Sequence, residues 1–243
     1  MKRETKEDLK QDEVRSIFEH GVEWLVKHRD EARIGGVVVI VLAAGIGALS
    51  YFQSNRAKEA TGALEQAMST WAAPVAAVAP GAEKPTGLTF GTSEAKYKAS
   101  LQEFEGVERR FGSRLEGRRA AYYVALCQVE LGMHAEAEKG LVALKSQRAG
   151  LESDLAQLAL AGLYRKMGQT EKAIELFRQI STDPQARVPR DAALAGLAAT
   201  FEDAKKPAEA LASYKQLVEE YPSSPYASDA RRRSEYLATA VKS

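Results

Sequence analysis

Residues 34–52 form an apolar stretch without a single charge, with the sequence IGGVVVIVLAAGIGALSYF. At about 1.5 Å rise per residue, a helix of this length would reach about 28 Å, close to the hydrocarbon thickness of a bilayer. A helix that packs on a globular core keeps a polar face, and this stretch has none. Tyr51 and Phe52 lie at one boundary, where aromatic residues often meet the membrane interface. The pattern predicts a transmembrane helix over 34–52.

This helix is expected to remain part of the chain. The tripeptide Ala48-Leu49-Ser50 resembles a small-x-small signal-peptidase site, so a cleaved signal peptide is the alternative. Signal peptides begin with a short basic region, whereas the 33 residues before the stretch carry nine carboxylates. Nearby Lys and Arg residues are more numerous before it (Arg15, Lys27, Arg29 and Arg33) than just after it (Arg56 and Lys58). That excess predicts a single-pass protein of the bacterial inner membrane, with its N-terminus in the cytoplasm and its C-terminal domain in the periplasm.

Small residues recur within the stretch at a spacing that lets helices approach closely. Ala43 and Gly47, and likewise Ala44 and Ala48, form small-xxx-small pairs. They predict a face for packing against another transmembrane helix, although small residues are also common in such helices without that role.

The segments on both sides of this stretch are expected to be helical, and a loop is expected to follow the second of them. Residues 1–33 predict a charged cytoplasmic helix with an apolar stripe, which lies on the membrane, docks onto a partner or simply leads into the span. A helix that continues from the membrane is expected over 53–71. Residues 72–92 are rich in Ala, Pro and Gly, and predict a loop that acts as a mobile linker or as a partner-binding strip.

The remainder of the chain, 93–243, repeats itself at a nearly constant interval. Small residues stand at spacings of 37, 36 and 37 residues, and each is followed four and then seven positions later by large apolar residues. The columns are Ser100, Ala137, Ala173 and Ala210; Phe104, Leu141, Phe177 and Tyr214; and Val107, Leu144, Ile180 and Leu217. A fixed period in this range indicates stacked helix–turn–helix units.

The composition and the missing motifs exclude several classes of function. The formal net charge is +1 with 28% charged residues, so no strong field would recruit nucleic acid. One cysteine and three scattered histidines make a metal site improbable, and the sequence lacks GxxxxGK[ST], GxSxG, HExxH and CxxC motifs. We therefore expect a binding protein rather than an enzyme, with no cofactor, no metal and no small-molecule substrate.

The repeat columns resemble the tetratricopeptide repeat. In that repeat, a large–small pair is followed by an aromatic residue, a turn glycine and a small residue. This chain has Leu160-Ala161, Tyr164, Gly168 and Ala173 in the same order. The next unit has Lys205 in place of the glycine. The resemblance implies an all-α fold in which the transmembrane helix precedes a solenoid of about three to four units. Pro225 is expected to start a C-terminal capping helix, on which Arg231, Arg232 and Arg233 are expected to be solvated.

The repeat register predicts a concave groove on the first helices. Its candidate partner-binding residues are Tyr122, Leu126, Glu130, Leu158, Arg165, Lys166, Glu202 and Asp203, with Tyr122 as an aromatic anchor. Ordinary exposed helix residues are the alternative for each of them. The only asparagine is Asn55, so a carboxylate clamp of lysines and paired asparagines cannot be assembled.

The order of parts resembles the bacterial ancillary subunit family of the SecYEG translocon, whose members carry one transmembrane helix and periplasmic tetratricopeptide repeats. The resemblance covers the charged N-terminus with Trp24, the apolar stretch and the repeats from Ser93 onward, while the loop at 72–92 is a departure. It implies a module that tethers chaperones or client polypeptides near the translocon. Its implied partners are SecYEG and a membrane-anchored periplasmic chaperone. The alternative is a scaffold for outer-membrane assembly, cell-wall or cell-division machinery.

Overall fold

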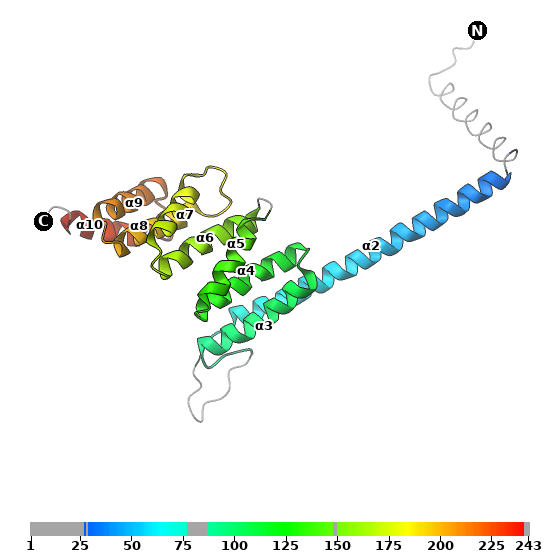
Figure 1. The fold of residues 1–243 in the computed structure, drawn as a ribbon, viewed down its shortest axis with the longest axis horizontal. Coiled ribbons are helices and arrows are strands. Elements are labelled where there is room, and N and C mark those ends of the chain that lie inside the picture. Colours follow the sequence, from blue (N-terminus) through cyan, green and yellow to red (C-terminus); the bar gives the residue numbers. More distant parts are fainter. Residues whose placement is uncertain (1–26, 28, 77–86, 148–149, 241–243) are drawn as a thin grey trace, which may run out of the picture. The chain divides into compact units, whose positions relative to one another are not determined.

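A computed structural model describes residues 27, 29–76, 87–147 and 150–240 of the chain. The chain divides into two units, residues 1–58 and 59–243, and the boundary falls within helix α2 (Arg29–Ala72). The expected cytoplasmic helix over 1–33 lies mostly outside the described residues. Over the described residues the fold is all-α, with nine helices and no named strand (Figure 1).

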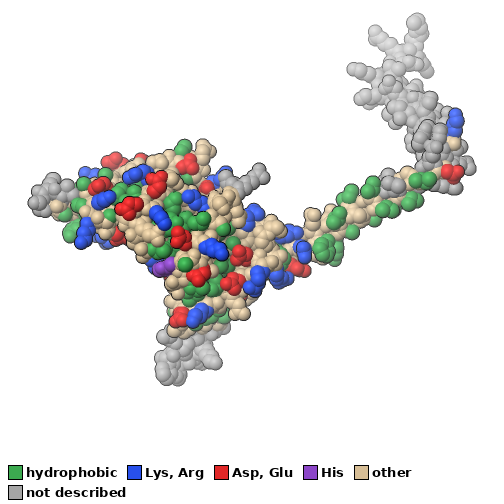
Figure 2. All heavy atoms as spheres, viewed as in Figure 1, with side chains coloured by type: hydrophobic (Ala, Val, Ile, Leu, Met, Phe, Trp, Pro, Cys, Tyr) green, Lys and Arg blue, Asp and Glu red, His purple; other side chains and the backbone are tan. Residues whose placement is uncertain are grey.

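In the first unit, α2 leaves its apolar side chains uncovered. Every large apolar side chain described between Ile34 and Phe52 is 60% to 70% exposed, and apolar atoms run along this part of the helix in Figure 2. Among the described residues, however, no helix combines the length and the apolarity that a membrane crossing requires. The transmembrane helix expected over 34–52 is therefore not supported by the structure.

The second unit is an array of helix pairs. After the end of α2 it contains α3 (Ser93–Phe111), α4 (Leu115–Glu130), α5 (His134–Lys145), α6 (Leu151–Lys166), α7 (Thr170–Thr182), α8 (Arg190–Asp203), α9 (Pro207–Glu220) and α10 (Ala227–Ala240). Each helix from α3 onward packs on the next one along the chain, and the alternate helices α4, α6 and α8 also contact one another in sequence. The helices α4, α6 and α8 are the first helices of their pairs, and α3, α5, α7 and α9 are second helices.

The repeat columns form the core of this array. Ala137, Ala173 and Ala210 are fully buried, and the large residues four and seven positions after each are at most 5% exposed. The large–small pairs of the first helices, such as Leu160-Ala161 and Leu197-Ala198, are buried as well. The prediction of stacked helix pairs is confirmed. The last helix, α10, begins at Ala227 rather than at Pro225, and buries Ala230 and Leu237 against the same core.

The first pair uses the end of α2 as its first helix. Ala60 and Ala67 are fully buried in a cluster with Phe104 of α3 and Cys127 of α4. The Trp71 ring makes an edge-on contact with Phe104, at 6.4 Å between ring centroids. This short cluster of aromatic and small residues joins the end of α2 to α3 and α4.

The segment between α2 and α3 is closed at its base by backbone hydrogen bonds. Phe90 donates its N–H to the carbonyl of Pro74 at 3.1 Å, and its carbonyl accepts the N–H of Ala76 at 2.9 Å. These bonds make an isolated parallel bridge between Val75 and Phe90. Two residues later, the Thr92 side chain caps α3 by accepting the N–H of Ala95.

Three turns between paired helices share one hydrogen-bond pattern. In the turn after α6, Gln169 N–H donates to the Tyr164 carbonyl and Gly168 N–H donates to the Arg165 carbonyl, which is the Schellman arrangement. The turns after α4 and α8 repeat both bonds, with Gly132 and Lys205 at the position of Gly168. All three residues have positive φ, and Lys205 has φ 55°. A side chain in this conformation is strained, so the turn and not the residue type fixes the geometry.

We expect Lys205→Gly to raise the free energy of unfolding by up to about 1 kcal/mol, because glycine adopts this conformation without steric cost. The matched change Gly168→Ala should lower it by about 1 kcal/mol, because it introduces the same strain at φ 70°. Urea unfolding followed by circular dichroism measures both. A stabilised Gly168→Ala protein would show that the turns are not equivalent.

Ser100 is the polar exception in the column of small residues. It is fully buried, and its hydroxyl has no hydrogen-bond partner among the described residues. The three equivalent positions carry alanine, which fits the same space without a polar atom. Burying an unpaired hydroxyl costs about 1 to 3 kcal/mol.

Ser100→Ala should therefore stabilise the protein by about 1 kcal/mol. Ser213→Ala is the control, because the Ser213 hydroxyl is also buried but donates to the Glu209 carbonyl at 2.9 Å. Thermal unfolding of the two variants compares them directly. Destabilisation by Ser100→Ala would mean that its hydroxyl is bonded in solution.

Candidate partner-binding groove

A groove opens at the C-terminal end of the array, where α6, α8 and α10 come together. Its volume is about 580 Å³. Its apolar lining comes from all three helices and from two second helices, and comprises Leu158, Gly162, Phe177, Ala192, Ala195, Gly196, Ala199, Tyr214, Leu217, Tyr226 and Ala230. Arg165, Glu202, Asp203, Asp229 and Arg233 supply its charged groups.

Two glycines in the lining have different surroundings. A Cβ at Gly196 would collide with the ring of Phe177, so this glycine lets α8 pack directly against that ring. A Cβ at Gly162 would meet no atom within 4 Å, so it faces the open groove. Gly196 therefore serves the packing of the array, whereas the space beside Gly162 is free for a ligand.

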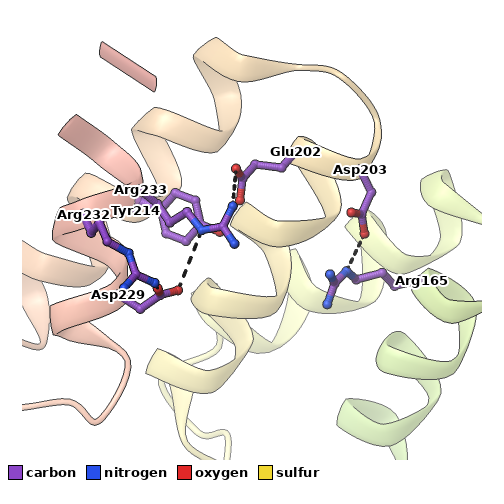
Figure 3. Close-up of polar contacts among 7 residues, drawn as sticks. All are labelled: Arg165, Glu202, Asp203, Tyr214, Asp229, Arg232 and Arg233. Carbon is purple, nitrogen blue, oxygen red and sulfur yellow. Dashed lines mark hydrogen bonds and ion pairs between the residues drawn. The ribbon is translucent and has the colours of Figure 1, made fainter. Parts of the chain in front are cut away.

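The charged groups form two separate sets of ion pairs, which Figure 3 shows together. Arg165 of α6 donates to Asp203 of α8 at 2.7 Å. Glu202 of α8 accepts from Arg233 of α10 at 3.2 Å and from the Tyr214 hydroxyl of α9 at 2.6 Å. Asp229 contacts both Arg232 and Arg233 within α10. Glu202 thus joins α8, α9 and α10 at a single carboxylate.

The Tyr214 hydroxyl is held in its protonated form. Burial raises the pKa of Tyr214 well above its ordinary value near 10, and the hydrogen bond to Glu202 and the negative charge of that residue raise it further. At neutral pH the hydroxyl is therefore a donor, and Glu202 has two donors for its two oxygens.

The structure brings four of the eight predicted groove residues together. Leu158, Arg165, Glu202 and Asp203 all line this groove. Lys166 lies beside it, in a hollow of about 440 Å³ that it shares with Gly162, Arg165 and Asp203.

The other three predicted groove residues lie on α4, apart from this groove. Tyr122 is half-buried against the core, its ring 5.5 Å from that of Tyr123, and burial raises its pKa. Leu126 is half-buried, whereas Glu130 is exposed and lines a different hollow with Tyr97 and Met133. These three residues therefore do not line the groove at α6, α8 and α10.

Sequence reasoning missed the contribution of α10. Asp229 and Arg233 of α10 line the groove, and Tyr226 lines it from the turn before this helix, although the arginines of α10 were expected only to be solvated. Arg232 and Arg233 pair with carboxylates. Their spacing from Asp229, three and four residues, was the available signal, because such pairs meet on one helix face.

The predicted transmembrane packing residues lie in the first unit. Ala43, Ala44, Gly47 and Ala48 are all exposed on α2, and a Cβ at Gly47 would meet no atom within 4 Å. Among the described residues, no group of His, Cys, Asp and Glu could hold a metal ion. Cys127 is buried, and burial raises the pKa of its thiol to about 12, so it remains a protonated core residue.

We expect Tyr214→Phe to lower the free energy of unfolding by about 1 to 2 kcal/mol at neutral pH, because it removes a buried hydrogen bond to a charged group. Since the folded pKa of Tyr214 lies above its unfolded value, this contribution is complete below pH 10. It is lost as the pH rises through the folded pKa. Urea unfolding at neutral and at strongly alkaline pH measures the change.

Tyr236→Phe is the matched control, because Tyr236 lies on α10 and is 69% exposed. It should change stability by less than about 0.5 kcal/mol at either pH. Equal effects of the two substitutions would show that the Tyr214–Glu202 bond adds nothing to the folded state.

Two family models match parts of the helix-pair array. Residues 156–187 and 192–224 each match a model of the tetratricopeptide repeat, and neither model describes an enzyme family. No curated protein matches the chain. Among solved structures, the chain is similar to the nearly identical TPR-like repeats of a Podosopora anserina protein described as a putative kinesin light chain, and to a form of those repeats with one substitution. Each match has 18% identity and a TM-score of 0.49, and covers 61% of this chain and 80% of the other. The two matched segments hold the helix pairs α6–α7 and α8–α9, so the chain contains tetratricopeptide repeats, a fold that serves protein interaction.

Proposed function

We propose that this protein is a membrane-anchored interaction module that holds a polypeptide segment of a partner in the groove between α6, α8 and α10. The observation that carries the proposal is the open space beside Gly162. The groove has about 580 Å³ of free volume and is bordered by the exposed Arg165–Asp203 pair. Such a site offers apolar contact at its floor and polar contact at its rim, as peptide-binding surfaces do.

The groove suits a segment of chain better than a small metabolite. It is open along several helices, and its charges come as pairs of both signs rather than as a cluster of one sign. Peptides bring backbone donors and acceptors together with apolar side chains, and can use both kinds of surface. The binding of a partner would require no chemistry from the groove.

The anchor in this proposal is the apolar part of α2. Its exposed apolar side chains, from Ile34 to Phe52, belong to a stretch without charge. An exposed apolar surface of this extent is more stable when lipid or protein covers it. As a helix, the stretch is about as long as the hydrocarbon layer of a bilayer is thick. By length and apolarity, none of the described helices qualifies as a membrane span.

The proposed location and partners follow from resemblance. The order of charged N-terminus, apolar stretch and repeats is similar to the ancillary subunit family of the SecYEG translocon. On that basis the groove would face the bacterial periplasm and hold a client polypeptide or a membrane-anchored chaperone near the translocon. An anchor raises the effective concentration of a bound partner at that place without any new contact.

A groove-filling substitution tests the proposal. Gly162→Tyr should reduce partner recovery about tenfold, because a Cβ at Gly162 meets no atom within 4 Å and the ring would extend from it into the groove. The full chain is tagged, extracted from carbonate-washed membranes in mild detergent, and assayed by immunoblot for translocon subunits and periplasmic chaperones. The wild-type chain should stay in the washed membrane pellet and recover both.

Gly106→Tyr is the matched control, since a Cβ at Gly106 of α3 also meets no atom within 4 Å and lies outside the groove. It should leave recovery unchanged. Loss of the wild-type chain from the washed membranes would overturn the anchor. Equal recovery by the Gly162→Tyr chain would overturn the assignment of this groove as the binding site. Recovery of cell-wall or outer-membrane assembly proteins in place of the translocon would overturn the assigned partners.

A further inference from the structure

A second groove lies between the second helices α3 and α5. It has a volume of about 380 Å³. Glu105 and Glu108 of α3 form one wall, and Glu136 and Lys139 of α5 line the other. Val124 of α4 and Leu144 of α5 are among its apolar residues.

The packing of α4 explains why this groove is open. Both α3 and α5 pack against α4, which lies between them along the chain. The residues at the floor are small, and a Cβ at Gly140 would lie 3.7 Å from that of Ala125. Small residues at this crossing leave a depression whose base is apolar and whose edges are charged.

The groove carries an excess of negative charge. Three carboxylates line it, against one cation, Lys139. Among the described residues, these carboxylates make one ion pair, between Glu105 and Arg109 at 3.8 Å. Arg109 is largely exposed and does not line the groove. Burial raises the pKa of Glu108, and the neighbouring charge of Glu105 raises it further. The positive charge of a cation placed between these two carboxylates would lower the pKa of Glu108 and offset the repulsion from Glu105.

The chemistry of the lining favours an organic cation over a metal ion. Among the described residues, no cluster of His, Cys, Asp and Glu has the geometry to hold a metal. The accessible alanines of the lining, Ala121 of α4 and Ala143 of α5, instead suit the methylene stem of Lys or Arg, whose charged head would reach the carboxylates. The volume admits one or two side chains of an extended or helical segment.

We propose that the groove between α3 and α5 binds a basic polypeptide segment, with a Lys or Arg head between Glu105 and Glu108 and its stem on Ala121 and Ala143. This surface is separate from the groove at α6, α8 and α10, so the proposal does not depend on the function assigned to that groove. It gives the repeat array a second contact surface with its own charge preference.

A fluorescent peptide measures this preference. The probe is a fluorescein-labelled, C-terminally amidated peptide of alternating leucine, lysine and alanine, and its counterpart has glutamate in place of lysine. Fluorescence anisotropy with the full chain in mild detergent should show binding of the lysine peptide and not of the glutamate peptide. Glu105→Gln with Glu108→Gln should weaken binding at least about tenfold. Lys139→Gln should strengthen it, because the cation that opposes the ligand is removed.

Glu171→Gln with Glu175→Gln is the control, because both residues are exposed on the second helix α7 and the net charge changes equally. It should leave the affinity within about twofold of wild type. Equal weakening by the two double substitutions would reduce the effect to net charge and overturn the groove. Absence of lysine-peptide binding to the wild-type chain, or weaker binding after Lys139→Gln, would also overturn it.

Discussion

Close approach of paired helices at a small residue is the constraint on which the array depends. Ala137, Ala173 and Ala210 are fully buried at successive second helices, and a larger side chain there would force each pair apart. The aromatic and aliphatic residues four and seven positions later fill the space that the close approach leaves. Because the constraint recurs at nearly constant intervals, each helix pair packs on the next in a similar way along the array.

The polar residues act at the end of the array, where repetition stops. Glu202 receives the Tyr214 hydroxyl and the Arg233 guanidinium, so one carboxylate fixes α10 to the last pair. The capping helix covers apolar residues that a further repeat would have covered, and it also supplies Asp229 and Arg233 to the groove. The same helix therefore completes the core and shapes the site.

The period of the small and large residues was sufficient to predict the helix pairs, because burial at those columns is a local and repeated requirement. Leu158, Arg165, Glu202 and Asp203 could be placed on one surface for the same reason. The sequence could not show that Tyr122 packs against the core, since this depends on how α4 meets its neighbours. Nor could it show the groove between α3 and α5, which arises from the small residues where these helices pack on α4. The membrane expectation illustrates a different limit, because an uncharged stretch identifies an apolar surface without showing what covers it.

The closed base of the segment between α2 and α3 has a consequence for how this chain can vary. The bonds between Phe90, Pro74 and Ala76 fix the two ends of the segment beside each other, before α3 begins. The entropic contribution to the free energy of closing such a loop grows only slowly with loop length, by about 0.6 kcal/mol for each doubling. Residues between the two bridged positions, Val75 and Phe90, can therefore be gained or lost with little effect on the stability of the helix pair formed by the end of α2 and α3. The bridge is a natural point at which a new sequence, and with it a new function, can be inserted.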